Sequence, residues 1–155
     1  FQANTLVEIS SSTIASNNAS RGGGLDFAES SGGTVTVNLR NTILAQNTAA
    51  TSPDANGALI SQGHNLLGNN AGSSGLADGV NGDKVGGGSN PVLDPLLDPL
   101  GNYGGPTETM RPQANSPAVD MGGNAGAPPT DQRGFGRPFN GTVDIGAVER
   151  GTLDV

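Results

Sequence analysis

Ser12-Thr13-Ile14-Ala15-Ser16-Asn17-Asn18 aligns with Asn41-Thr42-Ile43-Leu44-Ala45-Gln46-Asn47 at an offset of 29 residues. A weaker third copy, His64-Asn65-Leu66-Leu67-Gly68-Asn69-Asn70, follows after 23 more residues. Each copy has a polar residue, two small or aliphatic residues, two small or polar residues, and then asparagine. Repeated units of this length, with short strands separated by Gly and Asn turns, predict stacked rungs of a parallel β solenoid.

Alternating apolar and polar residues lie ahead of the first two copies, in Leu6-Val7-Glu8-Ile9 and Val35-Thr36-Val37-Asn38-Leu39. A period of two indicates strands with one face turned inward. The sequence therefore predicts an all-β chain that forms a short right-handed parallel β-helix of two to three rungs. A leucine-rich repeat has a similar period, but its L-x-x-L-x-L spacing is absent. The predicted core is Val7, Ile9, Ile14, Leu25, Phe27, Val35, Val37, Leu39, Ile43, Leu59, Leu66 and Leu67.

The corners of such rungs favour asparagine, which tolerates a left-handed backbone and forms hydrogen bonds with an asparagine stacked above or below it. We expect Asn17 or Asn18, together with Asn47 and Asn70, at these corners. The rungs are expected to occupy residues 1–70. Residues 71–100 combine a Gly-rich loop with a repeated Leu-Asp-Pro segment, which we expect to drape over the end of the barrel. Residues 101–155 are expected to form an irregular cap with almost no helix and with short strands near 118–119 and 143–148.

Composition narrows the choice of partners. The chain has 155 residues, of which 33% are apolar, 26 are glycine and 10 are proline. Its net charge of −7 argues against nucleic acid, because phosphate binding needs basic patches. No apolar stretch approaches the roughly 20 residues of a membrane span. An acidic surface rich in Asn, Thr, Ser and Gly is typical of extracellular bacterial proteins. The chain has no cysteine, which by itself does not fix the compartment.

Short motifs follow one another in the last part of the chain. They are Asn81-Gly82-Asp83, Asp94-Pro95-Leu96-Leu97, Gly104-Gly105-Pro106-Thr107, Ser116-Pro117-Ala118-Val119-Asp120, Asp131-Gln132-Arg133-Gly134, Arg137-Pro138 and Asp144-Ile145-Gly146-Ala147-Val148-Glu149. In order and spacing they resemble the C-terminal region of bacterial secreted parallel β-helix proteins of the choice-of-anchor type. The resemblance implies an extracellular or cell-surface protein of a group whose members mostly have no assigned activity.

Charged residues in these motifs suggest a structural clamp. Arg133 can fork two hydrogen bonds to one carboxylate. We expect it to pair with Asp144, Asp120 or Glu149 and to lock the cap onto the last rung, with Asp131 in the same cluster.

The sequence offers no catalytic residues. Polysaccharide-processing β-helices need carboxylates stacked on successive rungs, and no such pair can be placed here. His64 has no Cys, Ser or second His partner, and a corner role fits it better. Asp78, Asn81 and Asp83 lie in a Gly-rich loop and are a candidate Ca²⁺ site, although the spacing is not that of an EF-hand. The alternative is a solvated turn in which these side chains cap backbone amides. Calcium is the one cofactor that the sequence suggests.

The first rung begins in strand-like sequence at Phe1, without a polar cap. Its edge, with Phe1, Leu6, Val7 and Ile9, would leave amides unpaired and apolar side chains uncovered. We interpret the chain as a processed product or as part of a longer protein. We therefore expect either preceding rungs or a second copy docked head to tail, which can extend into a filament. The predicted function is a non-enzymatic structural module. The alternative is the C-terminal part of an exported protein that binds or degrades polysaccharide.

Overall fold

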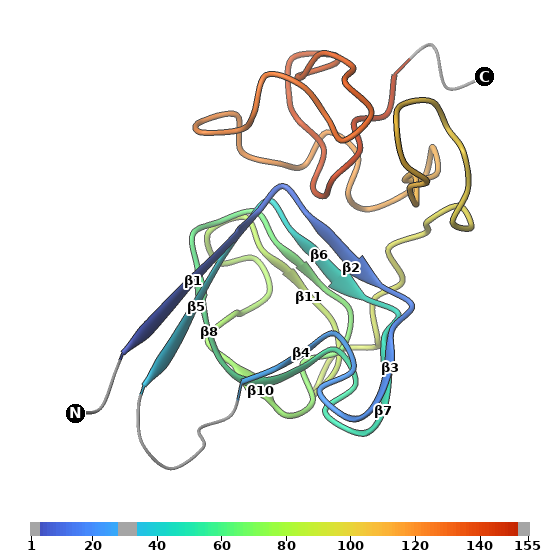
Figure 1. Ribbon diagram of the computed structural model, residues 1–155. Coiled ribbons are helices and arrows are strands. Elements are labelled where there is room, and N and C mark those ends of the chain that lie inside the picture. Colours follow the sequence, from blue (N-terminus) through green and yellow to red (C-terminus); the bar gives the residue numbers. More distant parts are fainter. Residues whose placement is uncertain (1–3, 28–33, 152–155) are drawn as a thin grey trace.

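The computed structural model describes residues 4–27 and 34–151, and this part of the chain is all-β, with no helix (Figure 1). Every pairing among its named strands is parallel. The strands are β1 (Thr5–Ser10), β2 (Thr13–Ala15), β3 (Asn18–Arg21), β4 (Leu25–Asp26), β5 (Val35–Arg40), β6 (Ile43–Ala45), β7 (Thr48–Thr51), β8 (Ala55–Ser61), β9 (Leu66–Leu67), β10 (Ser73–Ser74) and β11 (Lys84–Val85).

The strands form three parallel sheets through which the chain passes repeatedly. Sheet A has the order β1-β5-β8-β10, with β4 also paired to β8. Sheet B has the order β11-β9-β6-β2, and sheet C consists of β3 and β7. We call one passage through the sheets a circuit. Circuit one is β1 to β4, and β5, β6 and β7 lie directly on it, so that equivalent residues of successive circuits are neighbours (Figure 1).

The register between circuits differs by one residue from the sequence alignment. Thr13 pairs with Ile43, a separation of 30 residues, so the expected offset of 29 is wrong. Ser11 and Asn41 both adopt a left-handed backbone, with φ of 45° and 47°, and these corners set where each strand begins. A shift of one residue exchanges the inner and outer faces of a strand. The second expected offset, 23 residues, is confirmed by the pairing of Ile43 with Leu66.

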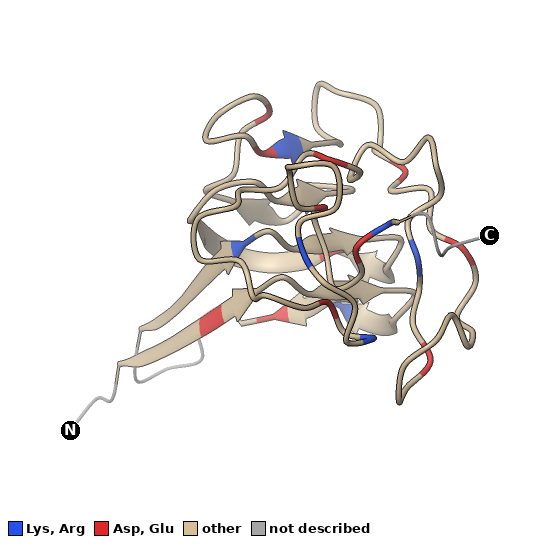
Figure 2. Cartoon of the chain, turned by 90° about the horizontal axis from the view of Figure 1, so that it is seen from above, with Lys and Arg blue, Asp and Glu red and all other residues tan. Residues whose placement is uncertain are grey.

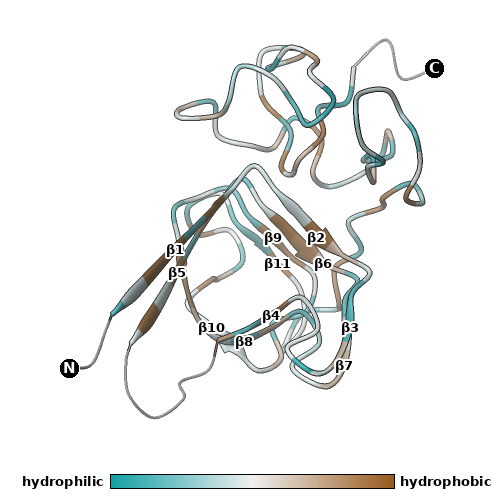
Figure 3. Cartoon of the chain, viewed as in Figure 1, coloured by the Kyte–Doolittle hydropathy of each residue, from teal (hydrophilic) through white to brown (hydrophobic). Residues whose placement is uncertain are grey.

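The space enclosed by the three sheets, which we call the coil, is filled by a narrow aliphatic core. Its buried members come from sheets A and B and from the loops beside them. Inward-facing residues of circuit one, among them Val7 and Ile9, pack against it and are only partly buried. Strands coloured as hydrophobic line this interior in Figure 3. The buried members are Val37, Leu39, Leu44, Ala55, Leu59, Leu67, Leu76 and Val85.

A second core lies on the outer face of sheet B. Ile43 and Leu66, which the sequence placed inside the coil, pack here with Ala45 against the C-terminal segment. That segment contributes Leu97, Ala118 and Ile145. Sheet B is therefore covered on both faces, as buried parallel sheets usually are.

The C-terminal segment flanks the coil instead of closing its end. Ala147 N–H donates to the Thr13 hydroxyl of circuit one, and Gly146 N–H donates to the Asn41 carbonyl of circuit two. Figure 1 shows the segment beside β2 and β6. We expected the Leu-Asp-Pro segment to drape over the barrel end and the cap to lock onto the last rung. The described part of the C-terminal segment instead covers the outer face of sheet B, because that face is itself apolar.

Other boundaries also differ from expectation. Parallel pairing continues through β10 and β11 to Val85, beyond residue 70. The stretches 118–119 and 143–148 form turns and loops and not the expected strands. Acidic and basic residues are interspersed over the molecule (Figure 2). The described part of the chain holds no helix that could cross a membrane.

Candidate functional site

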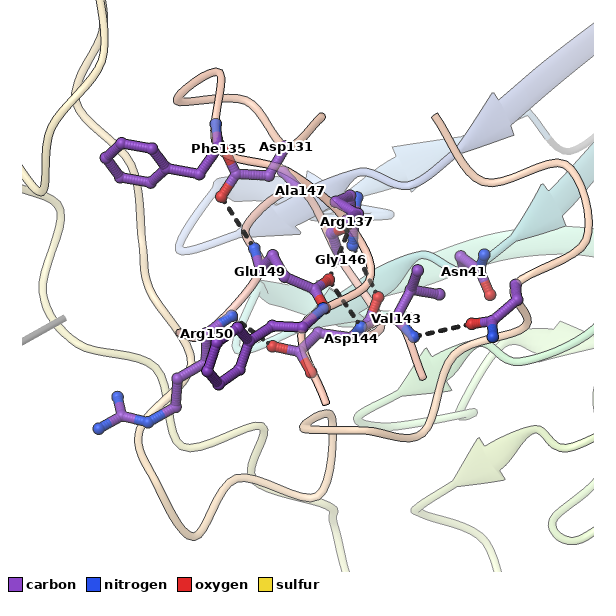
Figure 4. A network of polar contacts seen from close by, with 12 residues as sticks. Asn41, Asp131, Phe135, Arg137, Val143, Asp144, Gly146, Ala147, Glu149 and Arg150 are labelled. Atoms are coloured by element: carbon purple, nitrogen blue, oxygen red, sulfur yellow. Dashed lines mark hydrogen bonds and ion pairs between the residues drawn. The ribbon is translucent and has the colours of Figure 1, made fainter. Parts of the chain in front are cut away.

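A network of buried ion pairs fixes the C-terminal segment (Figure 4). Arg133 Nη2 lies 2.9 Å from Asp131 Oδ2, and the two side chains are 1% and 0% exposed. Arg133 also donates to the backbone carbonyls of Tyr103 and Glu149, and its guanidinium lies 4.7 Å from the ring centre of Phe135. The expected ion-pair partners were Asp144, Asp120 and Glu149. Arg133 forms an ion pair with Asp131, which the sequence placed in the same cluster, because the turn of residues 131–134 folds the two side chains back on each other.

A second buried pair joins Arg137 to Glu149. Arg137 Nε lies 3.0 Å from Glu149 Oε2, and the side chains are 1% and 2% exposed. Arg137 also donates to the carbonyls of Asp144 and Gly146. Glu149 accepts N–H bonds from Phe139 and Asp144. Each charge is thus both paired and hydrogen-bonded, which is the condition for burying ions without a large penalty.

Asp144 is fully buried and belongs to the same network. Its Oδ1 accepts the Asp120 N–H at 2.7 Å, and its Oδ2 accepts the Arg150 N–H at 2.6 Å. Burial raises the pKa of Asp144 from 3.8 to about 6. The two N–H donors lower this pKa, while the charges of Glu149 and Asp120 raise it. Asp120 contributes its backbone N–H to the network.

The raised pKa of Asp144 predicts a pH dependence of stability. A carboxyl whose folded pKa exceeds its unfolded pKa stabilises the fold below the unfolded value, and this contribution is lost as pH rises through the folded value. Between pH 3.8 and about 6 the loss is about 3 kcal/mol, at about 1.4 kcal/mol per pH unit. The difference in unfolding free energy between the native chain and Asp144→Asn should fall by about this amount between pH 3 and pH 7. Urea unfolding at several pH values measures it, and a difference that stays constant with pH contradicts the assignment.

The ion pairs hold a loop against sheet B. Ile145 N–H donates to the Ala118 carbonyl, and Gly146 N–H donates to the Asn41 carbonyl at the corner between β5 and β6. The Asn41 side chain donates to the Gly123 carbonyl and accepts the Gly123 N–H. Gly146 has a φ of 108°, and a Cβ there would lie 2.8 Å from Ile43 Cδ1. The clamp residues therefore fix a loop that packs closely against the sheet.

Hydrogen-bonded asparagine ladders connect the circuits at two corners. Asn47 Oδ1 accepts the backbone N–H and the side-chain amide of Asn17, at 3.0 and 2.9 Å. Asp54 Oδ1 accepts the same two groups of Asn47, both at 3.0 Å. The stacking of Asn17 on Asn47 confirms the expected corner. The position expected for Asn70 is taken by Asp54, whose pKa is raised by burial.

The second ladder lies at the corner before sheet B. Asn65 Oδ1 accepts the Thr42 N–H at 3.2 Å. Asp83 Oδ1 then accepts the backbone N–H and the side-chain amide of Asn65, at 2.8 and 3.0 Å. His64 precedes this ladder in a left-handed corner, and its Nδ1 lies 3.0 Å from the Met121 carbonyl oxygen.

The candidate calcium loop uses two of its side chains to hold the backbone. Asp78 Oδ1 accepts the Val85 N–H, and Asp83 Oδ1 serves the second ladder. Asn81 has a φ of 54° and offers its carbonyl to the His64 N–H. Within residues 4–27 and 34–151 there is no group of three His, Cys, Asp or Glu side chains that could hold a metal ion. Calcium binding by this loop stays a prediction.

The expected assembly edge is the outer edge of circuit one. β1 and β2 are terminal strands of sheets A and B, and β3 forms one edge of sheet C. The Leu6 side chain is 62% exposed, whereas Val7 and Ile9 pack inward against the coil core. Phe1 lies outside the described residues. Thr5 and Ser11 donate their N–H groups to circuit two, so the alternation of a parallel strand turns the N–H groups of Leu6, Glu8 and Ser10 toward the open edge.

The sequence interpretation missed Arg137, Asp54 and the ladder role of Asp83. The sequence did contain a signal for Arg137, because this arginine lies near the same carboxylates as Arg133. Asp54 and Asp83 carry none, because an acidic residue in a turn is ordinarily solvated. Only the fold shows that their oxygens replace those of an asparagine.

No protein-family model matches this chain, and comparison with curated proteins and with solved structures gave no significant match.

Proposed function

We propose that the chain is a non-enzymatic structural module of an extracellular or cell-surface bacterial protein. Its parallel circuits belong to a right-handed parallel β-helix, and its working surface is the open edge of circuit one. That edge binds a further parallel circuit, either from a longer chain or from a second copy stacked head to tail.

The observation that carries this proposal is the coincidence of three unpaired edges in one circuit. β1, β2 and β3 each lie at the edge of their sheet within the described residues. The interior residues of this circuit, such as Val7 and Ile14, are less buried than their partners Val37 and Leu44 in circuit two. Unpaired N–H groups beside incompletely covered apolar residues favour the addition of another strand.

The buried polar groups support a structural role. Asp131, Arg133, Arg137, Asp144 and Glu149 are all engaged in ion pairs or hydrogen bonds that hold the backbone. An acidic, cysteine-free composition fits an exported protein, and the ordered C-terminal motifs resemble those of secreted β-helix proteins.

Replacing Leu6 by proline tests the role of the open edge. Proline removes the Leu6 N–H, which faces outward, and leaves the β1–β5 hydrogen bonds in place. We expect the native chain to self-associate with rising concentration and Leu6→Pro to reduce the associated fraction at least about tenfold, the effect of about 1.4 kcal/mol. Sedimentation velocity measures the fraction, and electron microscopy shows whether the assemblies are fibres.

Leu6→Thr is the matched control. Threonine also removes the exposed leucine side chain, but it retains the N–H and a high strand propensity. Association that survives Leu6→Thr and is lost in Leu6→Pro supports pairing through the backbone edge. Equal association of the native chain and Leu6→Pro contradicts the proposal.

A further inference from the structure

Both asparagine ladders run in one direction. In the first, Asn17 donates to Asn47, and Asn47 donates to Asp54. In the second, Thr42 donates to Asn65, and Asn65 donates to Asp83. At every step the residue earlier in the chain donates and the later residue accepts.

Each ladder ends on a carboxylate. An asparagine side chain both accepts and donates, whereas an ionised aspartate side chain only accepts. Asp54 accepts three N–H groups, two from Asn47 and one from Asn69. Asp54 and Asp83 are each 2% exposed. The first ladder therefore ends within circuit two on Asp54, to which the later Asn69 donates back, and the second ends on Asp83, so neither final side chain has a donor to pass on.

The early end of the first ladder is open. Asn17 uses its amide to donate to Asn47 Oδ1 and to the Ala15 carbonyl. Its own Oδ1 has no hydrogen-bond partner among residues 4–27 and 34–151, and the residue is exposed. By repetition of the pattern, this oxygen is suited to accept an N–H from a residue that stacks ahead of Asn17.

A groove lies beside the same end. Its volume is about 720 Å³, and one wall is the continuous run from Thr13 to Asn17, which includes β2. The other wall belongs to the C-terminal segment and includes Leu100, Thr109 and Met110. The C-terminal segment therefore overhangs the open edge of sheet B.

Two features of the groove mark it as unfilled. Leu100 is 62% exposed, although it lies on a wall opposite an apolar strand. Thr109 is only 3% exposed, and its hydroxyl has no hydrogen-bond partner within the described part of the chain. A strand laid along β2 would cover the leucine and bring backbone groups toward the hydroxyl.

We propose that the groove binds the sheet B strand of one further 30-residue circuit, whose corner residue is an asparagine that donates to Asn17 Oδ1. The inference rests on the proposed function, which left two occupants open: a further circuit of a longer chain, or a second copy of this chain. The late end of a second copy is a poorer occupant than such a circuit, because its second ladder ends in the acceptor Asp83 and its last strands, β10 and β11, have only two residues each. The occupant is a circuit that resembles circuits one and two.

The test supplies this circuit within the full chain. Residues 4–33 are duplicated ahead of residue 4, so that a copy of circuit one precedes circuit one at the observed spacing of 30 residues. The backbone amides of Thr13 and Ala15 in the inner copy report on the groove. Ile43, the equivalent of Thr13 in circuit two, donates its N–H to circuit one, so the N–H groups of Thr13 and Ala15 should donate to the added circuit in the same way. We expect hydrogen exchange of these amides to slow at least about tenfold, which corresponds to about 1.4 kcal/mol. Unchanged exchange overturns the proposal.

Two matched pairs of variants locate the contacts. Leu100→Asp should abolish the added protection, whereas Val92→Asp, at a residue 66% exposed and outside the groove, should leave it intact. Asn17→Asp in the added copy replaces the amide donor by a carboxylate and should reduce the protection, whereas Asn4→Asp in that copy, at an exposed residue outside the ladder, should not. Protection that is insensitive to Leu100→Asp or to Asn17→Asp overturns the assignment of the groove or of the ladder.

The two proposals fail in different ways. If Leu6→Pro associates as strongly as the native chain, the proposal that the open edge of circuit one binds another circuit is contradicted. An extended chain whose added circuit stays unprotected, while the native chain associates through Leu6, contradicts only the choice of occupant. Circular dichroism and the exchange of the Val37 and Leu39 amides show that the original circuits remain folded.

Discussion

Arg133→Ala is expected to lower the free energy of unfolding by about 3–5 kcal/mol, because it leaves the fully buried Asp131 carboxylate without its ion pair. The change also removes donors to the Tyr103 and Glu149 carbonyls and the contact with the Phe135 ring. For a chain of this length, each kcal/mol shifts the melting temperature by about 2–4 °C, so a drop on the order of 10 °C is expected. Differential scanning calorimetry measures it.

Arg21→Ala is the matched control for this change. Arg21 forms an ion pair of similar length, 3.0 Å, with Asp26, but its side chain is 56% exposed. An exposed pair of this kind contributes under about 1 kcal/mol. Similar melting temperatures for the two variants would show that the Arg133 pair does not clamp the C-terminal segment.

Asp54→Ala is the second change with a large expected effect. It removes the acceptor of three N–H groups, from Asn47 backbone, Asn47 side chain and Asn69 backbone, at 3.0, 3.0 and 2.7 Å. Each buried donor left without a partner costs about 1–3 kcal/mol. We expect a total loss of about 3–5 kcal/mol, measured by urea unfolding at pH 7.

Asp54→Asn separates the hydrogen bonds from the volume of the side chain. Asparagine keeps an oxygen for Asn47 but turns an amide toward the Asn69 N–H, so about 1–2 kcal/mol should be lost. Burial raises the pKa of Asp54, which means that ionisation itself is disfavoured at this site. If Asp54→Ala is no more destabilising than Asp54→Asn, the ladder does not end at this residue in the way described.

The repeat in the sequence was sufficient to predict parallel strands, and it placed the corner asparagines Asn17 and Asn47 correctly. It was not sufficient for the register, because Ile14 resembles both Ile43 and Leu44 in size and polarity. The corners at Ser11 and Asn41 decide between them. The clamp was predicted as a cluster, yet its pairing was not, since two arginines and several carboxylates lie close together in the sequence.

The sequence alone determined an all-β chain with short inward-facing strands, because alternation and Gly/Asn turns act over a few residues. Only the tertiary structure decided where residues 91–151 lie. The outer face of sheet B is apolar at Ile43, Ala45 and Leu66, and a strand pattern cannot say which distant segment covers it. The tertiary structure likewise decided that the ladders end on Asp54 and Asp83, because only the folded chain brings these two carboxylates to the amides of Asn47 and Asn65.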